Sequence, residues 1–185
     1  MPTQRTFLGA VLATAMLAVP AAAQTAFRPA TVSFQAGGFL YGIESGGVFP
    51  MGAIRVDWPV TRFLRAEVGG SFARPGAVIH LDQYETPTAV NAHTQLFTAT
   101  AGLQLELPAR RVRPYAGVAA GVFARRDPSP GERFAAATRE VMGGVRVPLN
   151  ETVGVRGEVR LRLDGHQARG TSSNLEQTLG VTIKL

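Results

Sequence analysis

Three histidines carry the imidazole groups of this 185-residue sequence, and two of them lie near an aspartate. His80 precedes Asp82 and His166 follows Asp164, whereas His93 has no such neighbour. An imidazole near a carboxylate can act as a general base or bind a metal. Most such histidines are solvated turn residues, and the sequence has no Gly-x-Ser-x-Gly, His-Glu-x-x-His or phosphate-binding glycine loop. We therefore predict no catalytic residues, no metal ligands and no cofactor.

A larger set of reactive side chains consists of charges that recur at every second position. Between residues 153 and 163, Arg156, Glu158, Arg160 and Arg162 alternate with valine, glycine and leucine. Alternate side chains of a β-strand lie on opposite faces, so this spacing puts charge on one face and hydrocarbon on the other. The charged residues that we assign to the polar face of their strands are Arg55, Asp57, Arg65, Glu67, Glu106, Glu140, Arg146, Arg156, Glu158, Arg160, Arg162, Glu176 and Lys184. Seven are positive and six negative, so a space that they enclose would be nearly neutral.

The net charge of +6 raises the possibility of a nucleic-acid partner. The cations do not form a continuous basic run, however. The densest groups are Arg110 to Arg113 and the pair Arg125 and Arg126, at predicted turns. A surface that follows a phosphate backbone gathers its cations in one place, so we predict no nucleic-acid binding.

The N-terminal segment has the pattern of a secretory signal peptide. Arg5 precedes an apolar run over residues 7–19, which is followed by Pro20 and a stretch of alanines ending at Ala23. The run is shorter than the roughly 20 residues that a spanning helix needs. We therefore predict a cleaved signal peptide over residues 1–23 and a single domain over residues 24–185. Without cysteine, that exported domain has no disulfide to stabilise it.

Alternating hydrophobicity predicts eight strands that account for most of the mature chain. They cover residues 31–41, 48–58, 63–72, 93–107, 115–124, 136–147, 153–163 and 175–185. The connections that begin at Pro59, Pro108 and Pro148 are short, and most of the others are longer. This asymmetry, the even number of strands and their length of about ten residues are typical of membrane barrels. The predicted fold class is all-β, an eight-stranded antiparallel up-and-down transmembrane β-barrel.

The predicted outward faces carry mainly small and aliphatic residues, with aromatics near the strand ends. We predict that Trp58, Phe63, Phe72, Tyr115 and Phe123 contribute to the interfacial girdles. Within residues 115–124 both faces are apolar, so the orientation of this strand stays open.

The leader, the eight alternating strands, the proline-led turns and the final strand over residues 179–185 resemble the small OmpA/OmpX-like outer-membrane barrels. Such barrels usually end in an aromatic residue, whereas this sequence ends in Leu185. The resemblance implies a monomer in the outer membrane of a Gram-negative cell, in contact with membrane lipid and with the outer-membrane assembly machinery.

Several functional interpretations remain open at this point. The charged lumen is either a salt-bridged plug or a weak ion path. Arg125, Arg126 and Arg133 either bind lipopolysaccharide phosphates or form a solvated surface. We expect a non-enzymatic structural barrel that contributes to membrane integrity or to surface interactions through its loops. The alternatives are a lipid A deacylase-like enzyme that uses His80 or His166, and a secreted soluble barrel that binds a small apolar ligand.

Overall fold

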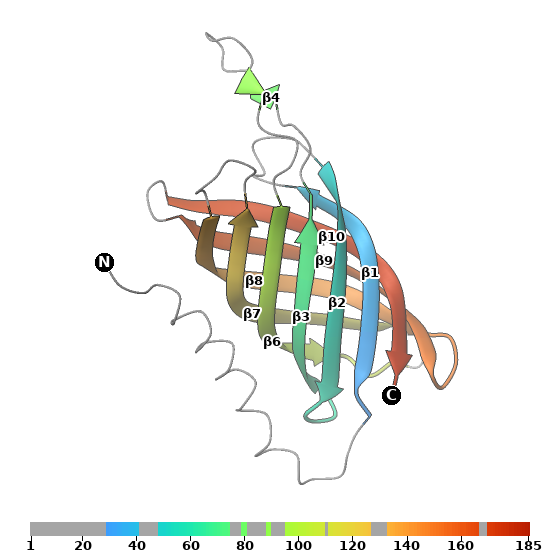
Figure 1. The fold of residues 1–185 in the computed structure, drawn as a ribbon. Coiled ribbons are helices and arrows are strands. Elements are labelled where there is room, and N and C mark those ends of the chain that lie inside the picture. Colours follow the sequence, from blue (N-terminus) through green and yellow to red (C-terminus); the bar gives the residue numbers. More distant parts are fainter. Residues whose placement is uncertain are drawn as a thin grey trace.

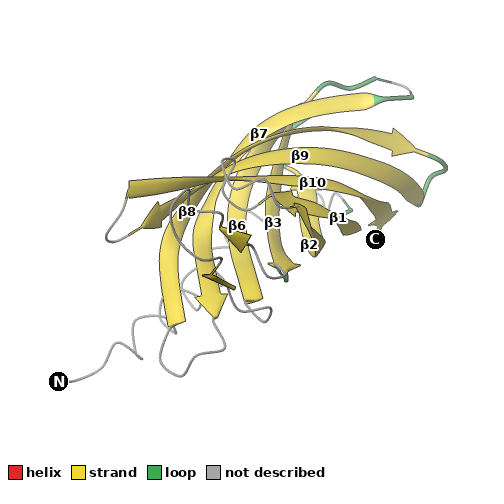
Figure 2. Cartoon of the chain, turned by 90° about the horizontal axis from the view of Figure 1, so that it is seen from above, coloured by secondary structure: helices red, strands yellow, loops and turns green. Residues whose placement is uncertain are grey.

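The computed structural model describes residues 29–40, 48–74, 79–80, 88–89, 95–109, 111–126, 133–166 and 170–185. Eight of the strands form a closed antiparallel barrel (Figures 1 and 2). These strands are β1 (Thr31–Leu40), β2 (Val48–Pro59), β3 (Leu64–Ala73), β6 (Gln95–Glu106), β7 (Arg113–Arg126), β8 (Arg133–Pro148), β9 (Val153–His166) and β10 (Gly170–Lys184). A separate short pair, β4 (Ile79–His80) and β5 (Thr88–Ala89), lies in the connection between β3 and β6.

Each barrel strand pairs with its neighbour along the chain, as predicted, and β1 closes the barrel by pairing with β10. The closing register sets Thr31 opposite Lys184 and Leu40 opposite Leu175. Closure pairs both edges of each barrel strand over most of its length, whereas residues 133–137 of β8 and 170–174 of β10, at the end with the long connections, are paired on one edge only. No helix in the described part of the chain is long and apolar enough to cross a membrane.

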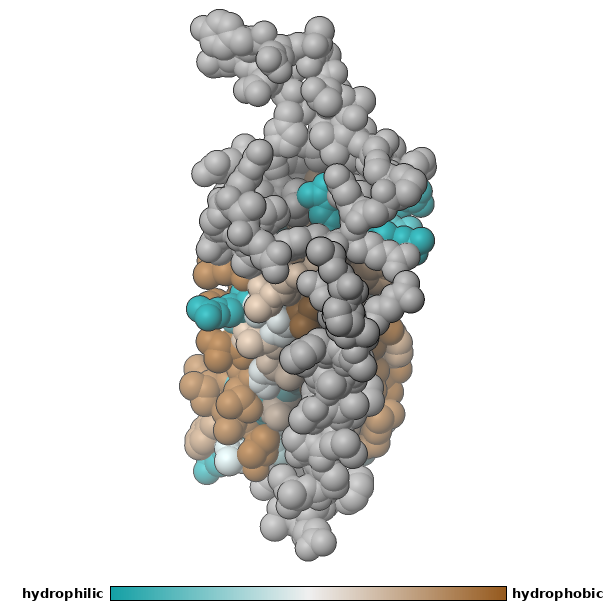
Figure 3. All heavy atoms as spheres, turned by 60° about the vertical axis from the view of Figure 1, so that its left-hand side comes forward, coloured by the Kyte–Doolittle hydropathy of each residue, from teal (hydrophilic) through white to brown (hydrophobic). Residues whose placement is uncertain are grey.

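Side-chain exposure follows the predicted period of two. Outward positions such as Ile54, Leu103 and Leu179 are exposed, whereas arginines and glutamates at the alternate positions are buried inside. Apolar side chains cover much of the wall that is coloured in Figure 3, and hydrophilic side chains are fewer there and lie mainly near its ends. A soluble carrier would show the reverse arrangement, with a largely apolar interior and a polar exterior. The observed arrangement is that of a barrel with lipid around it.

The last four barrel strands are longer than predicted. β7, β8, β9 and β10 extend beyond the predicted strands at the end where the long connections lie, so β8 begins at Arg133 rather than at residue 136. Neighbouring strands continue to pair there, as Arg126 does with Arg133. Backbone hydrogen bonding between paired strands needs no alternation of side-chain polarity, which is why the pattern underestimated these ends.

The assignment of Tyr115 and Phe123 to the outward girdle was wrong. Both side chains are buried inside the barrel, whereas Val118 of the same strand is exposed outside. Arginines from other strands lie over their rings, as described below, and so stabilise the inward orientation. Phe63 and Phe72 are exposed on the outside, as predicted, and Trp58 is partly exposed.

The short turns and the C-terminus lie together at one end of the barrel (Figure 1). In the turn between β8 and β9, Asn150 Oδ1 accepts hydrogen bonds from the backbone N–H of Thr152, at 2.9 Å, and of Val153, at 2.7 Å. The last residues join this turn to the start of β1, because Lys184 N donates to Thr152 O and Leu185 N donates to Ala30 O. In outer-membrane barrels the short-turn end faces the periplasm, so we call it the periplasmic end and the opposite one the external end.

Candidate functional site

The most extensive arrangement of charged groups is the lumen of the barrel. Twelve of the thirteen predicted charged residues take part in ion pairs there, and these twelve comprise six arginines and six carboxylates. They are Arg55, Arg65, Arg146, Arg156, Arg160 and Arg162, with Asp57, Glu67, Glu106, Glu140, Glu158 and Glu176. The thirteenth, Lys184, is exposed at the periplasmic mouth and forms no ion pair within the described residues.

Arg156 and Arg160 form the centre of this network. Arg156 pairs with Glu67 at 2.6 Å, with Asp57 at 3.5 Å and with Glu158, and its Nε donates to the Tyr115 hydroxyl at 2.7 Å. Arg160 pairs with Glu140 at 2.8 Å, with Glu158 at 2.6 Å and with Glu67. Both guanidinium groups are essentially inaccessible to solvent. A buried charge is costly unless paired, so these contacts are a condition for placing the charges inside.

Towards the external end, Glu176 joins two arginines from different strands. Its carboxylate lies 3.2 Å from Arg55 Nη2 and 2.6 Å from Arg162 Nη1, and it accepts a hydrogen bond of 3.1 Å from Ser71 Oγ. Arg162 also lies over the rings of Phe39 and Phe123, at 4.8 and 5.0 Å from their centroids. Arg162 thus connects the ionic network to the aromatic residues above it.

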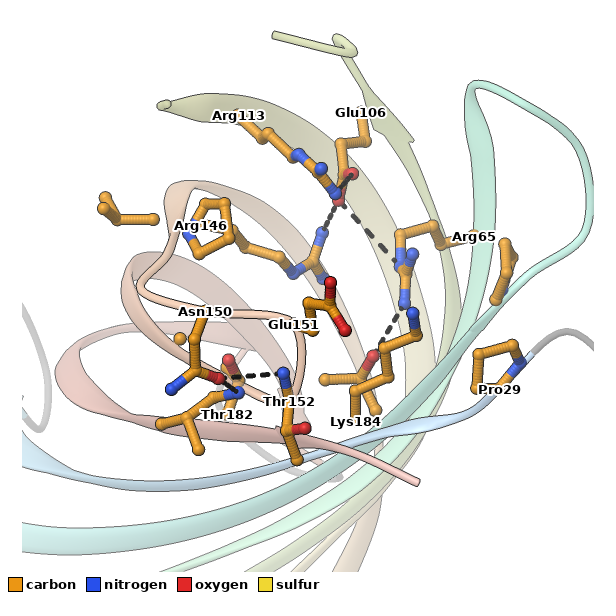
Figure 4. A pocket seen from close by; sticks show the side chains of 16 residues that line it. Pro29, Arg65, Glu106, Arg113, Arg146, Asn150, Glu151, Thr152, Thr182 and Lys184 are labelled. Carbon is orange, nitrogen blue, oxygen red and sulfur yellow. Dashed lines mark hydrogen bonds and ion pairs between the residues drawn. The ribbon is translucent and has the colours of Figure 1, made fainter. Parts of the chain in front are cut away.

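At the periplasmic end, three cations share the carboxylate of Glu106. Arg146 forms a hydrogen-bonded ion pair with it, and Arg65 and Arg113 each lie 3.9 Å away (Figure 4). Arg65 and Arg146 also pair with Asp57 deeper inside. The Tyr115 ring lies 4.2 Å from the Arg146 guanidinium and so fills the space between the mouth and the central network.

Two inner glycines provide the room that the large side chains need. A Cβ at Gly69 would lie 2.6 Å from Arg55 Cδ, and a Cβ at Gly144 would lie 2.6 Å from the Tyr115 hydroxyl and still closer to the backbone oxygen of Gly157. Glycine is therefore used where a buried side chain lies directly against the neighbouring strand. Because the sequence alone does not show which large residue faces each glycine, these pairings could not be predicted.

An apolar layer inside the external half of the barrel was missed by the sequence analysis. It consists of Phe39, Met51, Ala53, Ala73, Leu96 and Phe123, all buried in one cluster. Five of them lie near the external ends of their strands, and Ala53 lies in the middle of β2. The sequence contained a signal for this layer. Leu96 lies an even number of residues from Thr98, and Met51 from Arg55, so alternation places these apolar side chains on the inward face. We call these six residues the apolar layer.

A cavity of about 610 Å³ opens at the periplasmic end (Figure 4). Four cationic and two acidic side chains line it: Arg65, Arg113, Arg146, Lys184, Glu106 and Glu151. Its remaining lining includes Thr31, Thr152, Thr182, Asn150 and several proline and valine residues.

The chemistry that this arrangement supports is mutual neutralisation. Each of the six lumen carboxylates lies within 4.0 Å of a guanidinium, and arginine stays protonated in proteins. No group of histidine, aspartate and glutamate in the described ranges is placed to bind a metal ion. His93 and the side chains of His80 and His166 lie outside the described part of the structure.

Comparison with known proteins gives a family match over nearly the whole chain. The family model of the outer membrane protein beta-barrel domain matches residues 9–183. No curated protein matches the sequence at a significant level.

Three solved outer-membrane proteins have a similar structure. Neisserial surface protein A has a TM-score of 0.68 at 15% identity, covering 84% of this chain and 97% of its own. Ail, the attachment invasion locus protein of Yersinia pestis, has a TM-score of 0.58 at 10% identity, covering 85% and 99%. The N-terminal barrel domain of Pseudomonas aeruginosa OprF has a TM-score of 0.55 at 12% identity, covering 84% and 97%. At these identities the likeness shows the fold alone.

Proposed function

The chain belongs to the outer membrane protein beta-barrel domain family and lies in the cell outer membrane, and from this premise we propose that it is a closed structural barrel. Its contribution is then to the integrity of the membrane and to contacts made at its external surface. The filled lumen is the observation that carries this proposal.

Two layers of side chains obstruct the axis of the barrel. The ionic network fills the middle, where Arg55, Arg156, Arg160 and Arg162 are among the largest fully buried side chains. The apolar layer lies beyond it towards the external end. An eight-stranded barrel has an interior just wide enough for its own side chains. These layers favour the plug over the ion path.

Solute uptake by proteoliposomes tests the plug. We expect vesicles that contain the refolded protein to swell in isosmotic arabinose or glucose no faster than protein-free vesicles. A general porin, reconstituted at the same ratio, provides the positive control. Sugar entry at a rate comparable to that of the porin would contradict a sealed lumen.

We further propose that arginines of the external half bind the phosphates of lipopolysaccharide. Arg74 and Arg126 are exposed at the external ends of β3 and β7, and Arg125 is partly exposed beside Arg126. Arg133 pairs with Arg126 in the backbone register, although its side chain is not described. The planar guanidinium forms bidentate hydrogen bonds with phosphate oxygens. Ail, a protein of the same fold, has been crystallised with sucrose octasulfate, a polyanion.

Binding of purified lipopolysaccharide tests this second proposal. The double variant Arg125→Gln with Arg126→Gln is expected to bind more weakly and with a smaller salt dependence, because two cations are lost. A double variant of Arg62→Gln and Arg111→Gln is the matched control, since it removes the same charge at the periplasmic end. Equal loss in both variants would point to net charge rather than to a local site.

We propose a monomer without catalytic activity that the outer-membrane assembly machinery folds. Closure leaves only short unpaired edges in the described strands, such as those at the external ends of β8 and β10, for edge-to-edge association. The lumen carboxylates, each held by arginine, are poorly suited to act as general bases. Replacing His80 and His166 by alanine is expected to leave the lipid A mass spectrum of an overexpressing strain unchanged relative to the wild-type protein.

A further inference from the structure

The periplasmic cavity has more positive charge than its acidic residues can neutralise. Four cations line it against Glu106 and Glu151, and Asp57, which lies behind the lining, pairs with two of these cations, so one positive charge remains in excess. Its volume, about 610 Å³, lies in the range of small-molecule sites, roughly 300–1,000 Å³. The cavity therefore has both the size and the charge for a small organic anion.

The contacts of Glu106 show how incomplete the neutralisation is. This carboxylate lies within 4 Å of three guanidinium groups, those of Arg65, Arg113 and Arg146. Arg65 and Arg146 share a second carboxylate, Asp57, whereas Arg113 has no other acidic partner within the described residues. Lys184 pairs with no acid in the described part of the chain. Arg113 and Lys184 are thus the cations with most unused capacity for an anion.

The arrangement of the cations around the cavity supports the same conclusion. Figure 4 shows Arg113, Arg146 and Lys184 arranged around the same opening, on strands β7, β8 and β10. Cations from three strands that the fold brings together therefore surround one space.

We propose that the periplasmic mouth binds a small soluble phosphate monoester. Such a group carries nearly two negative charges at neutral pH, and Arg113 and Lys184 are two cations that can face them. Its oxygens accept hydrogen bonds from Arg113 and Lys184, in the charge-assisted geometry that arginine favours. The proline and valine residues of the rim, including Pro59, Val147 and Val153, provide contact for the carbon skeleton.

Glu151 provides a test in which the affinity for the anion should increase. Its exposed carboxylate lies in the lining and forms no ion pair within the described residues. It repels the bound anion, so its removal strengthens binding. A site at the periplasmic end is also independent of the lipopolysaccharide proposal, which concerns the opposite end of the barrel.

The test is a titration of the full mature chain, folded in an uncharged detergent at low ionic strength, with glycerol 3-phosphate. Backbone amide shifts of residues 150–154 and 182–185 report binding, and glycerol is the uncharged control ligand. We expect saturable shifts with glycerol 3-phosphate and none with glycerol. Arg113→Gln and Lys184→Gln should each weaken binding about three- to fivefold, because each removes one charge contact. Glu151→Gln should strengthen it by a similar factor.

Arg111→Gln is the matched control, because Arg111 is exposed beside Arg113 in sequence but does not line the cavity. It should bind glycerol 3-phosphate as the wild-type protein does, and heat-dependent gel mobility verifies that every variant is folded. Shifts that do not saturate, or that are insensitive to Arg113→Gln and Lys184→Gln, would overturn the proposal. So would nanodiscs in which phosphatidylglycerol shifts these amides and glycerol 3-phosphate does not compete, since the occupant is then a lipid headgroup.

Discussion

The middle and the external part of the lumen are filled in two different ways. In the middle, Arg156 and Arg160 each contact three carboxylates, and every large group needs a partner at a definite distance. In the apolar layer, Leu96 and Phe123 need only to fill a volume. The comparison teaches that one inner face can change from ionic to apolar without a change of strand period.

Arg162 marks the boundary between the two regions. It pairs with Glu176 on the ionic side and lies over Phe39 and Phe123 on the apolar side. A guanidinium suits this position because it forms ion pairs in its plane and stacks on aromatic rings with its face. The two regions therefore form one continuous packed interior.

Loss of a central cation should have the largest effect. Arg160→Met leaves Glu140 without its ion pair and takes one partner each from Glu67 and Glu158. Removing one partner of a buried pair typically costs about 3–5 kcal/mol, and we expect this decrease in the free energy of unfolding. Urea unfolding in lipid vesicles, followed through the single tryptophan Trp58, measures it.

Arg111→Met is the control for this measurement, because Arg111 is an exposed arginine at the rim. It should change the free energy of unfolding by less than about 0.5 kcal/mol. A similar decrease in both variants would mean that the central ion pairs are no more important than surface charge.

A cavity in the apolar layer should have the next largest effect. Leu96 is 2% exposed inside the barrel, and Leu96→Ala should lower the free energy of unfolding by about 2–3 kcal/mol through lost contacts and an unfilled space. Leu103→Ala, on the same strand but 48% exposed on the outside, is the matched control. Its smaller cost is expected because lipid chains fill the space that the side chain leaves. The reverse order would contradict the assignment of the two faces.

An added methyl group distinguishes the inner from the outer glycines. In Gly69→Ala the new Cβ meets Arg55 Cδ at 2.6 Å, so the guanidinium must shift away from Glu176. We expect a decrease of about 1–2 kcal/mol, which is typical of overpacking. The methyl group added in Gly52→Ala points outwards and has its nearest neighbour, the backbone oxygen of Gln35, at 3.9 Å. This variant should leave the free energy of unfolding almost unchanged in the same assay. Equal effects would show that backbone flexibility, rather than space, explains glycine at residue 69.

The exposed edge of the ionic region should show the smallest effect. Arg113 is 44% exposed and lies 3.9 Å from Glu106, so Arg113→Gln should change the free energy of unfolding by less than about 1 kcal/mol. The difference in the free energy of unfolding between this variant and the wild-type protein should shrink as salt is added, because exposed ion pairs are screened. A large, salt-independent loss would place Arg113 within the central network instead.

Most of the fold could be predicted from the sequence, because charge and hydrocarbon alternate along β9 and β10. Where both faces of a strand are apolar, as in β7, the local pattern does not determine the orientation. Tyr115 and Phe123 point inwards because Arg146 and Arg162, on other strands, lie over their rings. That information is present only in the folded structure.

The charged residues of the site were found by the same alternation, but their partners were not. Sequence phase does not show that Glu106 faces three arginines or that Lys184 lies at the mouth. A residue near a strand end can lie on the inward face of its strand and still be exposed, as Lys184 is. The apolar layer was missed because the expectation of a polar interior was applied to the full length of each strand.

The central claim, that one face of each strand meets lipid and the other a sealed interior, is tested most directly by spin labels on adjacent residues. The chain has no cysteine, so single cysteines at Thr178 and Leu179 can be labelled specifically. Their side chains are 8% and 65% exposed, respectively. In bilayers, the label at Leu179 should collide frequently with oxygen and rarely with a water-soluble nickel chelate, whereas the label at Thr178 should collide rarely with both. Frequent collision with the nickel chelate at Thr178, or at Leu179, would contradict a lipid-embedded barrel with a filled lumen.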